Sequence, residues 1–381
     1  MNLRYVAPLL ALGMILGSLR PGAFTQSFGH ATLWIFLPVL IFDAAWELDA
    51  LAARRLWRPI AFLAFPGVAL TAAAIAAAAH FAGGLSWRAA LLLGAILSAT
   101  DPIAVAALFR KLAVPSELLT IVESESLLND AVAVALYRAL LLAAASTALA
   151  ASPAPLVAGA FGGVVAGVAI GFAVAYVVAR VFLRNVAVPA QAVATFAGAY
   201  GAYYAAEYFG WSGIFAVIAF GIALRAFEGQ RISQDAVRAV GRAWEWLVVA
   251  ANGILFFLIG ASLDVTRLLH EPRLLLATLA GVTLARFVLT GALLLPAVRP
   301  HLPPAWLAVI RFAGVRGALS LALAIGTPLA LAHRGEIIDA TFFVVIVSIF
   351  ATAFTLERRV RRLGLSAGQE LLVQGVEQYF G

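Results

Sequence analysis

The chain alternates long apolar stretches with short polar connections from one end to the other. A helix of about 20 apolar residues, rising 1.5 Å per residue, is long enough to cross the hydrocarbon core of a bilayer. The pattern therefore predicts an all-α polytopic membrane protein of about twelve transmembrane helices, with no segment left for a soluble domain. The expected helices are 2–20, 28–48, 57–82, 88–110, 117–145, 153–183, 187–207, 209–227, 237–263, 272–298, 303–332 and 337–357.

The sixth stretch, 153–183, is the longest and would extend roughly 46 Å as a helix. A helix of that length must tilt strongly or lie partly along the membrane surface. Because it separates five helices from six, it suggests two inverted halves joined by a connecting helix, with one helix missing from the first half.

The fourth stretch is interrupted near its middle by Thr100, Asp101 and Pro102. Proline removes a backbone donor and disfavours helical geometry at the preceding residue, so we expect a broken helix whose exposed ends can hold an ion. The alternative is a simple proline kink in which Asp101 is a cap. The eleventh stretch, loosened by several glycines and carrying Arg316, is expected to be the broken counterpart.

The composition agrees with a membrane protein. Of the 381 residues, 64% are apolar and 12% charged, where soluble domains have about 25% charged residues. Lys and Arg number 26 against 19 Asp and Glu; because the basic residues lie between apolar runs, their excess concerns topology and not nucleic acid. The absence of cysteine excludes disulfides, thiolate metal sites and cysteine nucleophiles.

The orientation follows from the basic residues, because Lys and Arg near helix ends are retained on the cytoplasmic side. Along the twelve expected helices, sixteen basic residues fall on one side and five on the other. This asymmetry predicts that both termini are cytoplasmic.

Ionisable residues within membrane helices are costly by several kcal/mol and are functional candidates by default. The fifth stretch, 117–145, carries Ser126 and Asp130 one turn apart on one face and Glu125 and Asn129 on the adjacent face. The first pair offers hard oxygens to a monovalent cation, whereas Glu125 needs a basic partner. The spacing leaves three candidates for that partner: Arg286, Arg311 and Arg316.

Other acidic residues lie nearer the ends of their stretches. Asp43 is the deepest of the second stretch and could join the ion site, while Glu47 and Asp49 are expected at the membrane interface. Glu123, close to the start of the fifth helix, is expected to be solvated.

Several segments resemble the monovalent cation/proton antiporter superfamily, in particular the bacterial sodium/proton exchangers that carry an Asn-Asp motif. The two segments TDPIAV and ESLLNDAVAV, in that order and at that separation, are quite specific. The resemblance covers essentially the whole chain and rests on LPVLIFDAAWELD at 37–49, TDPIAV at 100–105, ESLLNDAVAV at 125–134, AWEWLVVAANGILFFLIG at 243–260, LARF at 284–287 and GVRGALSLALA at 314–324.

The resemblance implies a core domain with two crossing, unwound helices that moves relative to a dimerisation domain. It implies a homodimer surrounded by lipid, and the Ala- and Arg-rich composition suggests the inner membrane of a bacterium. The expected division is scaffold at 1–82 and 184–298, core at 83–152 and 299–357, a connecting helix at 153–183 and a short cytoplasmic tail at 358–381.

Carried over onto this chain, the resemblance makes Asp130 the aspartate that binds the cation or the proton in turn. It implies that the cation site is completed by Asp101, the backbone carbonyl of Thr100, the Ser126 hydroxyl and, through water, Asp43.

Four further residues are implied to support the site. Glu125 and Asn129 would pair with Arg286, which reaches the core from the scaffold range, and Arg316 would sit where the second pair of half-helices cross. Two departures stand out. Relatives have thirteen helices where twelve are expected here, the additional one preceding residue 1, and bacterial relatives often have Glu in place of Asp43.

The expected function is electroneutral exchange of a monovalent cation, Na⁺ above all, for H⁺ by alternating access, with a role in pH homeostasis. No enzymatic activity and no cofactor are expected, and the sequence shows no nucleotide-binding loop or dedicated metal-ligand cluster. The alternatives are a cation channel or uncoupled carrier, and a membrane-embedded enzyme. The five histidines, scattered near loop ends, do not favour the enzyme.

Overall fold

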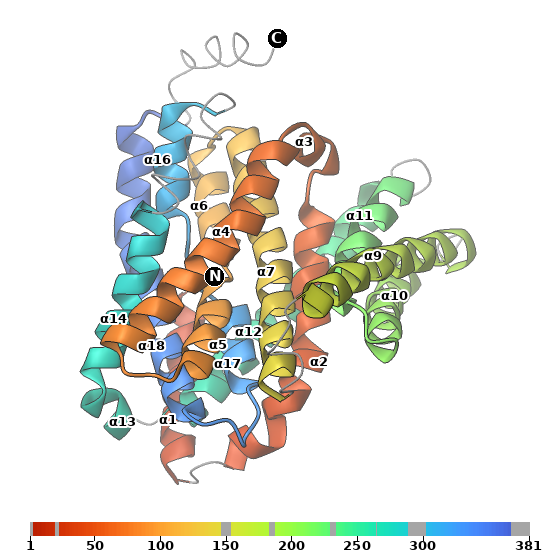
Figure 1. Ribbon diagram of the computed structural model, residues 1–381. Helices are drawn as coiled ribbons and strands as arrows, with labels where there is room; N and C mark the ends of the chain where they lie inside the picture. The colour runs from red at the N-terminus through yellow and green to blue at the C-terminus, as the bar shows by residue number, and fades with distance from the viewer. Residues whose placement is uncertain are drawn as a thin grey trace.

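The computed structural model describes residues 3–19, 23–145, 154–182, 187–228, 234–263, 265–288 and 302–366. Within these ranges the regular structure is helical. Most helices form an upright bundle, and α9, α10 and α11 lean away from it to one side (Figure 1). The α-helices are α1 (Leu3–Leu19), α2 (Ala23–Glu47), α3 (Ala50–Arg55), α4 (Trp57–Ala77), α5 (Trp87–Ser98), α6 (Ile103–Leu112), α7 (Ser116–Ala145), α9 (Ala154–Val177), α10 (Val188–Tyr208), α11 (Gly213–Glu228), α12 (Gln234–Ser262), α13 (Val265–His270), α14 (Pro272–Leu284), α16 (Pro304–Phe312), α17 (Ala318–Ile325) and α18 (Arg334–Arg362).

Each of the twelve predicted stretches overlaps at least one of these helices, although twelve membrane crossings stay a prediction. The eleventh stretch was predicted too long, because α17 ends at Ile325 and Pro328 follows shortly after, a residue that a helix interior does not accommodate. The last helix was predicted too short. It continues to Arg362, and Arg361 pairs with Glu357 one turn before it, a contact that favours helix. Residues 289–298 of the tenth stretch lie outside the described residues.

The short helices α3 and α13 were not predicted from the hydrophobic pattern. α3 begins where the Asp49 side chain accepts hydrogen bonds from the backbone N–H groups of Leu51 and Ala52, both at 3.0 Å. Such a cap stabilises a helix start independently of any apolar repeat. Asp49 is therefore an N-cap residue in this fold.

Five helices within the described residues are long and apolar enough to cross a membrane, judged by length and composition: Trp57–Phe81, Ser116–Ala143, Phe161–Arg180, Val237–Ser262 and Arg334–Arg362. The helices α5, α6, α16 and α17 are shorter because both predicted interruptions are present. Residues 99–102 separate α5 from α6, and residues 313–317 separate α16 from α17.

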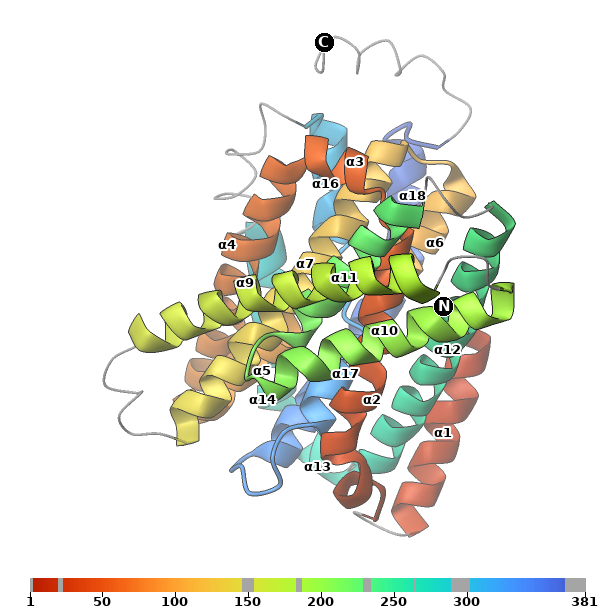
Figure 2. The same cartoon turned by 90° about the vertical axis from the view of Figure 1, so that its right-hand side faces the viewer.

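The helices divide into two packing groups. In the first, α4, α5, α7, α14, α16, α17 and α18 pack against one another. In the second, α1, α2, α9, α10, α11 and α12 do so, and α9 crosses the picture obliquely in both views (Figures 1 and 2). The groups meet where α2 and α12 contact α17, where α12 contacts α18, and where α7 contacts α2 and α9.

The boundary between these groups differs from the expected division of the chain. α4 packs on α5 and α7, and α14 packs on α4 and α18, although both helices fall in the ranges expected for the scaffold. Packing therefore places α4 and α14 with the broken helices. The roles of the two groups as scaffold and moving core stay predictions.

Candidate functional site

The two interrupted helices touch at their unwound segments. The backbone N–H of Asp101 donates to the carbonyl of Val315 at 2.8 Å, and the Ser320 hydroxyl donates to the carbonyl of Ile96 at 2.9 Å. Unwound backbone in a membrane needs such partners because no lipid group can satisfy it. Each broken helix thus supplies the hydrogen bonds that the other has lost.

Asp101 lies at the N-terminal ends of two half-helices. Its Oδ1 accepts a hydrogen bond from the backbone N–H of Ile103, 2.9 Å away, at the start of α6. The same carboxyl group lies against the backbone N–H of Ala318, the first residue of α17. A side chain at Gly317 would collide with this carboxyl group, so the close approach requires glycine there. The negative charge of Asp101 matches the positive ends of both helix dipoles.

Two arginines lie at the opposite, C-terminal ends. The fully buried Arg316 donates from Nε to the carbonyl of Leu97 near the end of α5, at 2.8 Å, and from Nη1 to the carbonyl of Gly314, at 2.6 Å. Arg286 donates from Nη2 to the carbonyl of Ile310, at 2.6 Å, and from Nε to that of Arg311, at 3.3 Å, where α16 ends. Cations at these positions stabilise the negative helix ends.

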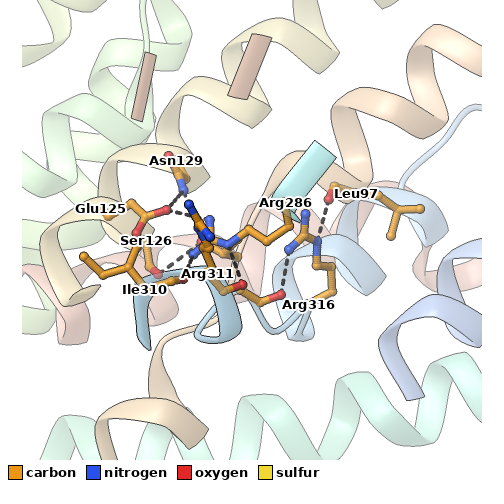
Figure 3. A network of polar contacts seen from close by, with 10 residues as sticks. Leu97, Glu125, Ser126, Asn129, Arg286, Ile310, Arg311 and Arg316 are labelled. Atoms are coloured by element: carbon orange, nitrogen blue, oxygen red, sulfur yellow. Dashed lines mark hydrogen bonds and ion pairs between the residues drawn. The ribbon is translucent and has the colours of Figure 1, made fainter. Parts of the chain in front are cut away.

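Glu125 on α7 forms an ion pair with Arg286, with 2.9 Å between Oε1 and Nη1 (Figure 3). The two side chains are 3% and 11% exposed. Asn129 donates from Nδ2 to the same Glu125 oxygen at 3.4 Å and to the Thr100 hydroxyl at 3.2 Å. The structure thus selects Arg286 from the three arginines that spacing left open, and this is the pairing that the resemblance implied.

The other face of α7 carries Ser126 and Asp130. The Thr100 hydroxyl donates to the Ser126 hydroxyl at 3.1 Å, and both residues are buried. The carboxyl group of Asp130 faces the backbone of Thr100 and the carboxylate of Asp101. Its Oδ1 is covered from solvent and has no hydrogen-bond partner among the described residues. Asp130, Asp101, Thr100 and Ser126 are therefore brought together as expected.

A small polar cavity lies on the Glu125 side of this cluster. It has room for about one water molecule and is lined by α4 and by polar residues of the crossing: Thr71, Ser98, Thr100, Glu125, Asn129, Arg286 and Arg316. The Oδ1 atom of Asn129 is buried without a hydrogen-bond partner in the described structure. The cavity belongs to the face of paired charges, and Asp130 is not among its lining residues.

Asp43 lies in different surroundings. Its nearest charged groups are Glu47, Glu245 and Arg110, and the contacts of the described residues do not join it to Asp101 or Asp130. The structure thus leaves Asp43 apart from the other predicted ligands, and its contact through water stays a prediction.

The expectation that Glu123 is solvated was wrong. Its side chain is 17% exposed and forms an ion pair with Arg110 of α6, with 2.6 Å between Oε1 and Nη2. Spacing along α7 could not show this because the partner comes from another helix. Glu47 lies 3.9 Å from the same guanidinium and is 54% exposed, as expected for an interfacial residue.

Sequence analysis missed Ser348 on α18. Its hydroxyl accepts a hydrogen bond from the backbone N–H of Arg316 at 3.1 Å and donates to the carbonyl of Val345 at 2.9 Å. It thereby satisfies a backbone donor of the unwound segment. A lone serine in an apolar helix carries no signal that separates this role from ordinary packing.

An all-helical membrane protein in which two broken helices cross beside a buried carboxylate has the construction of a secondary transporter. Comparison with known proteins agrees. The family model for transmembrane sodium/hydrogen exchangers matches residues 2–361. The chain belongs to the sodium/hydrogen exchanger family, whose members are transporters and not enzymes.

Individual relatives share both sequence and fold. The chain is 33% identical over 339 residues to the Na⁺/H⁺ antiporter ApNhaP of Aphanothece halophytica, covering 87% of this chain and 64% of that protein. It is 30% identical over 352 residues to the Na⁺/H⁺ antiporter NhaH of Halobacillus dabanensis, covering 90% and 85%. The structure of the sodium proton antiporter MjNhaP1 from Methanocaldococcus jannaschii matches with a TM-score of 0.76 and 20% identity, over 92% of each chain.

The chain spans about two thirds of the length of two of the relatives it matches. Its match covers 64% of ApNhaP and 65% of the low-affinity Na⁺/H⁺ antiporter NhaS1 of Synechocystis, to which it is 33% identical over 88% of its own length.

Proposed function

We propose that this protein exchanges Na⁺ for H⁺ across a membrane and that Asp130 binds the two ions in turn. The observation that carries the proposal is Oδ1 of Asp130, which has no hydrogen-bond partner among the described residues, beside a crossing where Asp101, Arg316 and Glu125 have theirs. Asp101 contacts the N-termini of two helices, Arg316 contacts the C-terminus of a helix, and Glu125 forms an ion pair with Arg286. Asp130 is therefore the carboxylate free to exchange ligands.

The proposed cation ligands are oxygens. They are the carboxylates of Asp130 and Asp101, the backbone carbonyl of Thr100 and the hydroxyl of Ser126, with Asp43 contributing through water. Oxygen ligands suit hard alkali cations. The hydrogen bond between Thr100 and Ser126 supports the proposal because it places a hydroxyl beside Asp130. Arg286 and Arg316 bind backbone carbonyls of the crossing, Glu125 pairs with Arg286, and Asn129 donates to Glu125 and Thr100.

Exchange follows from one carboxylate with two competing ligands. A bound cation favours the ionised carboxylate and a bound proton neutralises it, so release of either ion permits binding of the other. A bare charge is costly to move through lipid, so the site moves only when it is occupied. Asn129, which cannot titrate, leaves one alternating charge in the Asn-Asp pair, and the proposed stoichiometry is one cation for one proton.

The proposal extends to the setting of the protein. It places the protein as a homodimer in the inner membrane of a bacterium, with both termini in the cytoplasm, where it contributes to pH homeostasis. The sequence resemblance supports the dimer, and the distribution of basic residues supports the orientation.

Reconstitution into proteoliposomes that contain a pH-sensitive dye tests the proposal. Addition of Na⁺ to one side should move protons in the opposite direction, and Li⁺ and K⁺ tested in turn would give the selectivity. Liposomes carrying the Asp130→Asn variant at equal protein density are the control. Cation flux without proton movement would show a channel or uncoupled carrier and contradict the proposal.

A further inference from the structure

A second set of partly buried charges lies away from the crossing. Arg138 is on α7, about two turns beyond Asp130, and its guanidinium forms an ion pair with Glu207 near the end of α10. Nη2 of Arg138 also donates to the hydroxyl of Tyr203 at 3.2 Å. The Arg138 and Glu207 side chains are 32% and 10% exposed. Charges within membrane helices are costly, so this pair calls for an explanation that the ion site does not supply.

Glu207 is also held by a contact that does not involve Arg138. Oε1 of Glu207 also accepts a hydrogen bond, 2.9 Å long, from the backbone N–H of Gly213, the first residue of α11. A Cβ atom at Gly213 would lie 2.8 Å from that oxygen and 2.7 Å from the Tyr203 ring, so the turn between α10 and α11 requires glycine here. The side chains of Glu207 and Tyr203 are thus held in position to bind Arg138.

The ion pair joins the two packing groups of the fold. α7 packs on α4 and α5, whereas α10 packs on α9, α11 and α12. In the described residues α7 and α10 have little direct backbone contact, and Figure 1 shows α9, α10 and α11 leaning away from the upright α7. The ion pair therefore joins α7 to a helix on which it hardly packs, although α7 also contacts α2 and α9 of the second group.

We propose that Arg138 and Glu207 are positioning residues for the exchange, whose ion pair holds α7, and with it Asp130, in its present place relative to α10 and α11. This inference rests on the proposed function, because alternating access moves the helix that carries Asp130 relative to the second group. A contact present in one position of α7 and absent in another biases the two populations by its own strength.

The chain offers matched variants that separate the charge from the local fold. Glu207→Gln removes the charge but keeps a carbonyl oxygen for the Gly213 N–H. Arg138→Met leaves the α10–α11 turn untouched and is the second variant if the first fails to accumulate in the membrane. Arg138→Lys retains the charge. Arg361→Gln is the control, because it breaks the exposed pair with Glu357 within a single helix.

Spin labels on α7 and α10 test the inference without any transport. The chain has no cysteine, so Leu142→Cys and Val193→Cys, which are 58% and 67% exposed in the native protein, accept labels selectively. The unaltered pair should give one dominant distance. Glu207→Gln and Arg138→Met should shift the ratio of the two populations about tenfold toward a second distance, the scale of a lost charge-assisted hydrogen bond.

Exchange kinetics give a second test that a purely structural role would not satisfy. A shift between two conformers changes the half-saturating Na⁺ concentration in opposite directions on the two sides of the membrane, because apparent affinity scales with the competent fraction. Arg361→Gln should remain near the unaltered protein in both tests. Arg138→Lys should lie between the unaltered protein and Arg138→Met, because an ammonium keeps the charge but lacks the two donor nitrogens that reach Glu207 and Tyr203.

Unchanged distance distributions in Glu207→Gln and Arg138→Met would overturn the inference, as would Arg138→Lys behaving like Arg138→Met. The distance measurement does not depend on ion exchange. Failure of the proposed function would therefore appear separately, as absent proton movement in the unaltered protein.

Discussion

The carboxylates on the two faces of α7 differ in their hydrogen-bond and ion-pair partners. Glu125 contacts Arg286 at 2.9 Å and is supported by Asn129, whereas Asp130, five residues further along the same helix, has an oxygen without a hydrogen-bond partner in the described structure. A buried charge with a full set of partners holds helices together, and breaking such a pair is costly. A carboxylate with an oxygen left unpaired is available to a mobile ion. Glu125 therefore stabilises the crossing, whereas Asp130 is the proposed ion-binding group.

The largest expected effect comes from removing the unpaired carboxylate. Asp130→Asn should reduce exchange in proteoliposomes to the level of empty liposomes, because an amide can neither release a proton nor offer a charge to a cation. The variant should still elute as a folded protein in size-exclusion chromatography. Exchange at the normal rate in this variant would remove Asp130 from the mechanism.

On the face of α7 that carries the Glu125–Arg286 ion pair, the main expected effect is a loss of stability. Removing one partner of a buried ion pair costs about 3–5 kcal/mol, so Arg286→Ala and Glu125→Ala should each lower the thermal unfolding temperature more than Asp130→Asn does. The double variant should lose less than the sum of the two single losses, because the partners interact directly. Equal melting temperatures for Arg286→Ala and Asp130→Asn would contradict the assignment of a stabilising role to the Glu125–Arg286 pair alone.

A smaller effect is expected from the hydroxyls between the two faces. Ser126→Ala removes one neutral hydrogen bond, worth about 0.5–1.5 kcal/mol, together with a proposed cation ligand. Thr100→Val removes the hydrogen bonds to both Ser126 and Asn129. The half-saturating Na⁺ concentration should therefore rise several-fold in Ser126→Ala with little change in melting temperature. A loss of stability without a change in Na⁺ dependence would make Ser126 structural.

The smallest expected effect is that of the membrane potential. With Asn129 beside Asp130, one charge alternates between proton and cation, so each translocation step carries the same net charge. A potential imposed with K⁺ and valinomycin, worth about 2.3 kcal/mol per charge per 100 mV, should not drive net exchange. Potential-driven Na⁺ uptake without a pH gradient would show that a second proton moves.

Much of the fold follows from local sequence signals. Pro102 excludes a continuous helix across Asp101, and the glycines around Arg316 favour the second interruption. The two broken helices were therefore predictable, as were the two faces of α7 from helical periodicity. The ends of α17 and α18 were missed, because a hydrophobic pattern does not register the proline that follows α17 or the charged pair that extends α18.

The partners of the site residues were harder to predict, because they come from distant parts of the chain. Spacing left Arg286, Arg311 and Arg316 open for Glu125, and the resemblance was needed to choose among them. Arg138 and Glu207 were passed over although each is an ionisable residue in an apolar helix. Treating all such residues alike would have singled out both, but their mutual contact depends on how α10 packs beside α7.

Proton release on cation binding tests the central claim most directly. Purified protein in weakly buffered detergent solution, at a pH where part of the protein is protonated, should release up to about one proton for each Na⁺ bound, because the two ions compete for one carboxylate. The Asp130→Asn variant should release none. Na⁺ binding without proton release in the unaltered protein, or equal release from the variant, would contradict the account.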